Sequence, residues 1–233
     1  MVSYNNSIAR IKVVANALAE LSEKTVFVGG ATVSLYATDS TAWESRPTDD
    51  VDVIVEIISY SNYSLFEEKL RAVGFRNEAE SRVICRYKIQ GIIVDIMPID
   101  DAVLGFSNLW YKEGMKNAVE IEIHEGTKVL IFQAPYFLAS KFEALKNRGM
   151  SDLRYSSDFE DIIYLFDNRQ ELLDELVNAN ETVKMYLQNA IKGLLKHPII
   201  QEAIESNVEQ DFIYARANNI MELWNKFIEQ WQY

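Results

Sequence analysis

A short apolar run that ends in two glycines, followed by a strand that begins with two acids, constrains the fold of this chain most. Residues 26–32 read Val-Phe-Val-Gly-Gly-Ala-Thr, which predicts a buried strand, a tight turn and then a helix. Residues 51–57 read as a second strand, with Asp50 and Asp52 at its start. Because side chains alternate along a strand, both carboxylates point to one face of the sheet. Neighbouring carboxylates repel unless a cation neutralises them, so this strand is a candidate metal site.

A third acid lies within residues 92–98, which read Ile-Ile-Val-Asp-Ile-Met-Pro. An acid in the middle of a buried strand is costly unless it has a partner. If this strand lies beside strand 51–57, Asp95 completes a three-carboxylate site for Mg²⁺ or Mn²⁺, which take oxygen ligands. Asp100 and Asp101 follow closely, so a slip in the strand register would bring another acid to this place.

The turn at Gly29 and Gly30 is a candidate phosphate-binding site. Glycine lets a ligand approach the backbone closely, and the N-terminus of the following helix favours negative charge. The alternative is a tight strand–helix turn that binds no ligand. A phosphate cradle beside an acidic metal site is typical of phosphoryl or nucleotidyl transfer.

These blocks, in this order, resemble the DNA polymerase beta-type nucleotidyltransferase superfamily. Residues 46–52, Arg-Pro-Thr-Asp-Asp-Val-Asp, resemble its AbiEii-like branch of abortive-infection, toxin-type proteins. A second block agrees, formed by residues 136–144 and 157–163, and the matching parts span roughly residues 24–168. The chain departs from many superfamily members at Gly30, where those members carry serine, and Thr32 is a candidate substitute for the missing hydroxyl.

The resemblance implies catalytic and metal-binding roles for the three acids. Asp50 and Asp52 would hold the metal ion that bridges the triphosphate. Asp95 would join a second metal ion and act as base on the attacking hydroxyl. The cofactor is therefore expected to be Mg²⁺ or Mn²⁺, with an NTP as substrate.

The resemblance also implies a set of nucleotide- and phosphate-binding residues. These are Gly29, Gly30, Thr32, Lys141, Asp158 and Asp161. For Lys141 the alternative is a surface cation whose stem packs on apolar neighbours. For Asp158 and Asp161, three residues apart on one helix face, the alternative is surface charge at the start of a helix that Ser156 or Ser157 caps. The sequence does not say which of the two acids contributes. Arg46 either contacts a phosphate or only its own loop.

The composition is that of a soluble globular protein, with 48% hydrophobic and 25% charged residues among 233. No apolar run approaches the roughly 18 residues that span a bilayer, and no signal-peptide core is apparent, which favours a cytoplasmic location without a membrane. The single cysteine, Cys85, excludes an intrachain disulfide and is expected to be buried. A net charge of −12 argues against a broad nucleic-acid surface, although a local basic groove is compatible with it.

The expected fold class is α+β: a small mixed sheet flanked by helices, followed by a helical domain. Residues 1–134 would form the nucleotidyltransferase catalytic domain, and residues 135–233 a helical domain that completes the nucleotide cleft. Hairpins are predicted around Gln90-Gly91 and residues 124–127, and residues 39–49 form a loop over the nucleotide or a plain connector. The predicted helices cover residues 3–21, 31–37, 63–73, 107–116, 135–147, 156–167, 170–177, 180–195, 199–206 and 208–231.

The leading hypothesis is an enzyme that transfers NMP from an NTP to a hydroxyl and releases pyrophosphate. By resemblance, the acceptor is a tRNA 3′ end or a protein, and the protein is a toxin of a toxin–antitoxin or phage-defence system with a cognate antitoxin. One alternative is a small-molecule, aminoglycoside-type nucleotidyltransferase. Another is a non-catalytic interaction module that retains the fold, which the missing serine at Gly30 favours.

Overall fold

The computed structural model describes residues 2–229 except residues 22, 79–80 and 82. The chain divides into two compact units. Met1–Thr32 and Arg46–Gln133 form the first, and Val33–Ser45 and Ala134–Tyr233 form the second. The segment Val33–Ser45 therefore groups with the helical part of the chain, whereas the sequence analysis includes it in residues 1–134.

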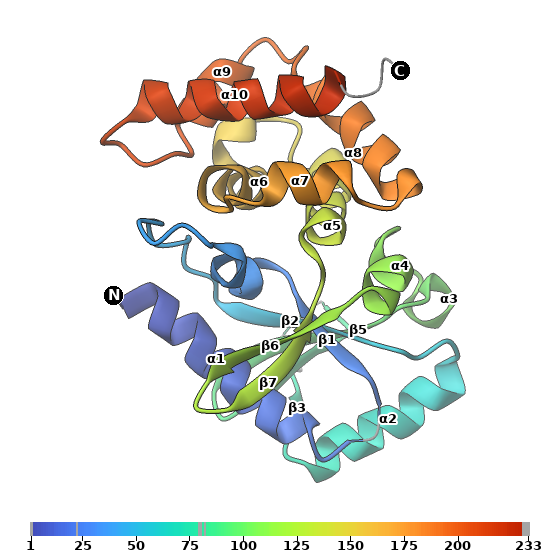
Figure 1. Ribbon diagram of the computed structural model, residues 1–233. Helices are drawn as coiled ribbons and strands as arrows, with labels where there is room; N and C mark the ends of the chain where they lie inside the picture. The colour runs from blue at the N-terminus through green and yellow to red at the C-terminus, as the bar shows by residue number, and fades with distance from the viewer. Residues whose placement is uncertain (1, 22, 79–80, 82, 230–233) are drawn as a thin grey trace. The chain divides into compact units, whose positions relative to one another are not determined.

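The first unit is built on a seven-stranded sheet with the order β3-β4-β5-β2-β1-β7-β6 (Figure 1). Two of its pairings, β2 with β5 and β1 with β7, are parallel, and the others are antiparallel. The sheet is mixed, and helices flank it, which confirms the predicted α+β class. The strands are β1 (Thr25–Val28), β2 (Asp50–Val55), β3 (Arg76–Asn77), β4 (Arg86–Ile89), β5 (Ile92–Pro98), β6 (Val119–His124) and β7 (Thr127–Ile131).

Both predicted hairpins are confirmed, and their turns show why. Gln90 and Gly91 join β4 to β5 with φ of 47° and 81°, and Glu125 and Gly126 join β6 to β7 with φ of 49° and 76°. Two consecutive positive φ angles match the right-handed twist of the flanking strands, and glycine tolerates them without strain. The sequence analysis missed β3, because a two-residue strand carries no periodic pattern.

The helices of the first unit lie against this sheet. Helix α1 (Val2–Leu18) packs on β2, β6 and β7, and α2 (Tyr60–Ala72) begins after Ser59, whose side chain accepts from the Asn62 N–H. Helix α2 thus starts three residues before the predicted position because Ser59 caps it. Helix α4 (Tyr111–Lys116) is shorter than predicted, and α3 (Asp101–Leu104) was not predicted. The predicted helix 31–37 is a 3₁₀-helix, η1 (Gly30–Tyr36).

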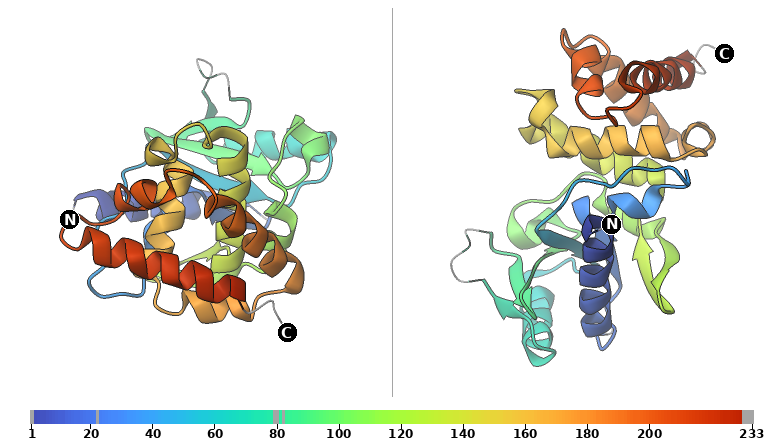
Figure 2. Two further views of the ribbon diagram at one scale, coloured as in Figure 1. Left: turned by 90° about the horizontal axis from the view of Figure 1, so that it is seen from above. Right: turned by 90° about the vertical axis from the view of Figure 1, so that its left-hand side faces the viewer.

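The second unit is helical, as Figure 2 shows. Helix α5 packs against α6, α7 and α8, and α10 packs against α6, α8 and α9. Trp224 and Phe227 of α10 are fully buried, whereas the helix begins at Ile213 and not at residue 208. The elements are α5 (Ala134–Arg148), η2 (Leu153–Tyr155), α6 (Ser157–Asn168), α7 (Leu172–Val177), α8 (Glu181–Leu194), α9 (Ile200–Glu205) and α10 (Ile213–Glu229).

Two further features of the fold concern Cys85 and the hydrophobicity of the helices. Cys85 is buried, as predicted, and burial together with the charge of Asp95 raises its pKa to about 12. A thiol with so high a pKa stays protonated and is a poor nucleophile. None of the helices in the described residues has the length and hydrophobicity that crossing a bilayer requires.

Candidate active site

The register of two parallel strands sets the position of the candidate carboxylates. Asp52 of β2 lies directly beside Asp95 of β5, and Asp50 lies two residues earlier on β2. All three side chains therefore share one face of the sheet. Asp95 is 8% exposed, and Asp50 and Asp52 are half-buried, while Val51 and Val53 are fully buried. The structure places the three predicted acids on one face of two adjacent strands.

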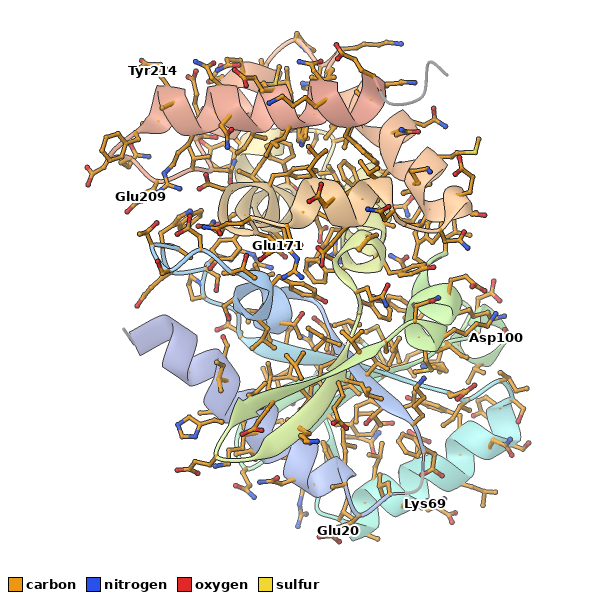
Figure 3. The ribbon with its side chains drawn as sticks, viewed as in Figure 1. Glu20, Lys69, Asp100, Glu171, Glu209 and Tyr214 are labelled. Carbon is orange, nitrogen blue, oxygen red and sulfur yellow. The ribbon has the colours of Figure 1, made fainter. Side chains whose placement is uncertain are left out.

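Asp100 lies outside this group, although its closeness to Asp95 in sequence left the register open. Its side chain accepts from the Ala102 N–H and caps α3, and it pairs with Lys112 at 2.7 Å. Figure 3 labels it beside the short helix α3. The pairing with β2 thus singles out Asp95.

A residue that the sequence analysis did not select, Arg86, lies between two of the acids. Its Nε donates to Asp95 Oδ1 at 2.8 Å, and its Nη2 donates to Asp95 Oδ2 at 2.8 Å and to Asp50 Oδ2 at 3.0 Å. The hydrogen bonds with Asp95, above all, raise the pKa of Arg86. The predicted hairpin could have identified Arg86, because counting outward from the turn at Gln90-Gly91 puts Arg86 opposite Asp95.

The turn after β1 approaches the same carboxylates. Gly29 has a φ of +73°, and a Cβ placed on it would lie 1.8 Å from Asp52 Oδ2. A Cβ on Gly30 would lie 2.5 Å from Nη2 of Arg46 and 3.4 Å from Oγ1 of Thr48. Each glycine is therefore matched to a neighbour: Gly29 to the Asp52 carboxylate and Gly30 to the Arg46 guanidinium.

Thr32 stabilises this turn through two hydrogen bonds to the backbone of Gly29. It is fully buried, and its hydroxyl donates to the carbonyl oxygen of Gly29 at 2.9 Å, while its N–H donates to the same oxygen at 3.3 Å. The hydroxyl holds the left-handed turn in shape. The space beside Gly30 is filled by Arg46 and Thr48.

The other predicted nucleotide-binding residues form a buried ion network in the second unit. Lys141 of α5 lies 2.6 Å from Asp161 Oδ2 and 3.4 Å from Asp158 Oδ1, both on α6. Arg148 donates to Asp158 at 2.7 and 3.0 Å. Lys141 is 5% exposed and each acid 1%. The alternatives of a surface lysine and surface acids are therefore wrong. Of the two expected caps, Ser156 is the one observed, and its side chain accepts from the Phe159 N–H.

Asp158 remains an acid despite its burial. Desolvation raises its pKa, but the hydrogen bonds from Arg148 and the charge of Lys141 outweigh this, so the pKa of Asp158 lies below its ordinary value. The ionised carboxylate is thus a permanent partner of the two cations at neutral pH.

Comparison with known proteins identifies the fold. No family model and no curated protein matches the chain. Among solved structures it is similar to an antigenic nucleotidyltransferase-like protein from Paracoccidioides brasiliensis, with 19% identity and a TM-score of 0.53 over 91% of this chain and 98% of that one. It is also similar to the antibiotic-resistance factor ANT(2″)-Ia, with 16% identity and a TM-score of 0.51 over 83% and 97% of the two chains. The chain has a nucleotidyltransferase-like fold.

The family resemblance of the sequence implies a divalent metal ion, and the acids of the sheet fit such an ion in their chemistry. Asp50, Asp52 and Asp95 offer carboxylate oxygens, the ligands that Mg²⁺ and Mn²⁺ prefer. Within the part of the chain that the structure describes, no three His, Cys, Asp or Glu side chains are arranged around one point as metal ligands. Instead the guanidinium of Arg86 bridges Asp50 and Asp95. The donor set suits a metal ion, and an arginine supplies the neutralising charge.

Proposed function

We propose that this chain is a metal-dependent nucleotidyltransferase that moves NMP from an NTP to a hydroxyl and releases pyrophosphate. The observation that carries the proposal is the alignment of Asp50, Asp52 and Asp95 on adjacent strands, with Gly29 against the Asp52 carboxylate, in a nucleotidyltransferase-like fold. The AbiEii-like resemblance of residues 46–52 supports the same reaction.

The three acids would have two roles at the reacting phosphate, which are metal binding and acceptance of a proton. Bound Mg²⁺ or Mn²⁺ supplies positive charge that offsets the charge of the triphosphate. Asp50 and Asp52 would hold it, and Asp95 would be a further ligand. The Asp95 carboxylate, buried at the sheet face, would accept the proton that the acceptor hydroxyl releases as it attacks the α-phosphorus. The bond from that phosphorus to the β-phosphate oxygen breaks, and pyrophosphate leaves.

Phosphate binding would fall to the turn after β1. The backbone N–H groups of Gly29 and Gly30 would donate to phosphate oxygens, since neither residue has a side chain of its own between its backbone and a ligand. The guanidinium of Arg46, which fills the place of a side chain at Gly30, adds a cation of the geometry that phosphate accepts. Thr32 would maintain the turn and would contribute no hydroxyl of its own.

Lys141, Asp158 and Asp161 are proposed to bind the nucleotide as a unit. The two buried acids hold the lysine ammonium in a fixed position, so that its charge would be preorganised for the pyrophosphate that leaves the triphosphate. Both acids contact Lys141, so both would contribute. Arg148 would complete the network by neutralising Asp158.

The acceptor is proposed to be a tRNA 3′ end or a protein, in a toxin with a cognate antitoxin. With a net charge of −12, a small acceptor site is better supported than extensive wrapping by RNA. A second candidate is a small-molecule nucleotidyltransferase, which the similarity to an antibiotic-resistance factor favours. The proposed location is the cytoplasm, where NTPs and Mg²⁺ are available.

The test is label transfer from each α-labelled NTP, with Mg²⁺, into total tRNA, protein and aminoglycosides. The protein would be compared with Asp52→Asn, Asp95→Asn and the control Asp101→Asn, an exposed acid on α3. Label on one acceptor class that the first two substitutions abolish and the control retains would support the proposal. Label that survives both would mean a different active site. Neither label nor thermal stabilisation by any NTP would favour the non-catalytic interaction module.

A further inference from the structure

The backbone pairing of three strands places Arg86 on the same face of the sheet as the acids. Arg86 pairs with Asp95 across the antiparallel strands β4 and β5, and Asp95 pairs with Asp52 across β5 and β2. Directly opposite residues in such a ladder place their side chains on the same face. One guanidinium and two carboxylates therefore form a lateral row over three adjacent strands, with Asp50 on the same face.

The hydrogen bonds of Arg86 use the oxygens that a metal ion would need. Two of its N–H groups meet the two oxygens of Asp95, and Nη2 also reaches Asp50. A guanidinium fork matches a carboxylate in this bidentate way. A divalent ion that bound Asp50 and Asp95 would occupy the same lone pairs, and the two cations would repel each other. Arg86 and the metal ion cannot both hold this position.

The side chain can leave without unfolding the strand. Arg86 is the first residue of β4, and its side chain is 25% exposed, compared with 11% for Asp95. Rotation of its long stem would carry the guanidinium toward solvent while the backbone pairing of β4 with β5 remained.

From these observations, and resting on the proposed function, we propose that Arg86 is a resident cation that a divalent metal ion must displace. Without metal, its guanidinium neutralises Asp50 and Asp95, whose mutual repulsion would otherwise destabilise the sheet. With metal, it gives up these hydrogen bonds. Arg86 thus stabilises the metal-free protein and weakens metal affinity, since only the fraction of molecules with Arg86 displaced can bind the ion.

The experiment measures Mn²⁺ binding to the full chain by electron paramagnetic resonance, without nucleotide. Arg86→Gln is compared with Arg76→Gln, a substitution of an exposed arginine on the neighbouring strand β3 that removes the same charge. We expect Arg86→Gln to bind Mn²⁺ about tenfold more tightly than wild type, and Arg76→Gln to bind within about twofold of it. Arg86→Gln should also unfold at a lower temperature without metal, and saturating Mn²⁺ should abolish this difference.

A second variant covers the case in which Arg86→Gln does not fold. Arg86→Lys keeps a cation but loses the bidentate fork, so its Mn²⁺ affinity should lie above that of wild type. If wild type binds Mn²⁺ and the Arg86 variants bind equally or less tightly, the inference is overturned while the metal site stands. If no variant binds Mn²⁺, both the inference and the metal site of the proposed function fall. In the double variant Arg86→Gln/Asp95→Asn, persistence of tight binding would place the ion elsewhere and also overturn the inference.

Discussion

Gly29 carries the strictest steric demand among the residues around the candidate site. Its φ of +73° is costly for other residues, and Asp52 leaves no room for a Cβ. Gly126 has a similar φ of +76°, but no atom lies within 4 Å of the place where a Cβ would be. A substitution at Gly126 therefore tests backbone strain alone, whereas one at Gly29 tests backbone strain together with the contact with Asp52. This difference makes the close approach of Asp52 testable.

We predict that Gly126→Ala lowers the free energy of unfolding by about 1 kcal/mol, the cost of the left-handed backbone alone. Gly29→Ala should lower it by about 1–3 kcal/mol more, because a Cβ must displace the Asp52 carboxylate. Urea denaturation of both variants measures the difference. Equal losses would mean that Asp52 moves aside freely and that Gly29 does not position it.

The buried acid Asp158 gives a prediction about pH. Its folded pKa is lower than the ordinary 3.8, so its stabilising contribution is fully present above pH 3.8 and is lost as the pH falls through the folded value. Asp158→Asn should therefore be less stable than wild type at neutral pH, and the gap should narrow on acidification below about pH 4. Denaturant unfolding over this pH range measures the gap.

The exposed acid Asp174 on α7 provides the control for the loss of one negative charge. Asp174→Asn should stay close to wild type at all these pH values. A gap between wild type and Asp158→Asn that stays constant on acidification would contradict a lowered pKa.

Among the elements, the segment before β2 has a defined place in the second unit. The N–H groups of Thr38 and Asp39 donate to the Asn168 carbonyl oxygen, and Glu171 accepts from the Thr38 hydroxyl. The indole of Trp43 donates to Asp167 at 2.9 Å, and its ring lies 5.1 Å from that of Tyr164. Residues 38–43 are therefore anchored to the end of α6.

We predict that Trp43→Phe lowers the unfolding free energy by about 1 kcal/mol, the net worth of one hydrogen bond, because Arg216 still pairs with Asp167. Trp43→Ala also loses the ring contact and should cost about 2 kcal/mol or more. Limited proteolysis should then cut within residues 37–45 faster in Trp43→Ala than in Trp43→Phe. Identical cleavage of both variants would show that the aromatic contact does not hold this segment.

Sequence patterns predicted the elements with strong local signals and failed where the cause lies elsewhere in the chain. The positive-φ turns, the strand that carries Asp95 and the glycine turn were predicted because each is encoded within a few residues. The burial of Lys141 was not predicted, because its partners Asp158 and Asp161 lie on another helix. Arg86 was overlooked, although the hairpin register could have found it, because it lies outside the blocks of sequence that carry the family resemblance.

For the whole molecule, the net charge of −12 bears on any nucleic-acid acceptor. We predict that tRNA binding, measured with Asp52→Asn to prevent turnover, depends only weakly on salt. The slope of log K against log salt should correspond to about two or three phosphate contacts. Filter binding at several salt concentrations gives this slope. A slope equivalent to about six or more contacts would reveal an extended basic surface instead.

The interleaving of the two units has a consequence for how such a protein can be recombined. The chain passes between them after Thr32, after Ser45 and after Gln133, so neither is one uninterrupted stretch of sequence. If the gene were cut at residue 134, the fragment for the helical unit would lack residues 33–45. The fragment for the sheet unit would contain these residues, although they belong to the other unit. The helical unit therefore cannot be exchanged between genes by a single crossover. That unit would have to change by point substitution or by two coordinated exchanges.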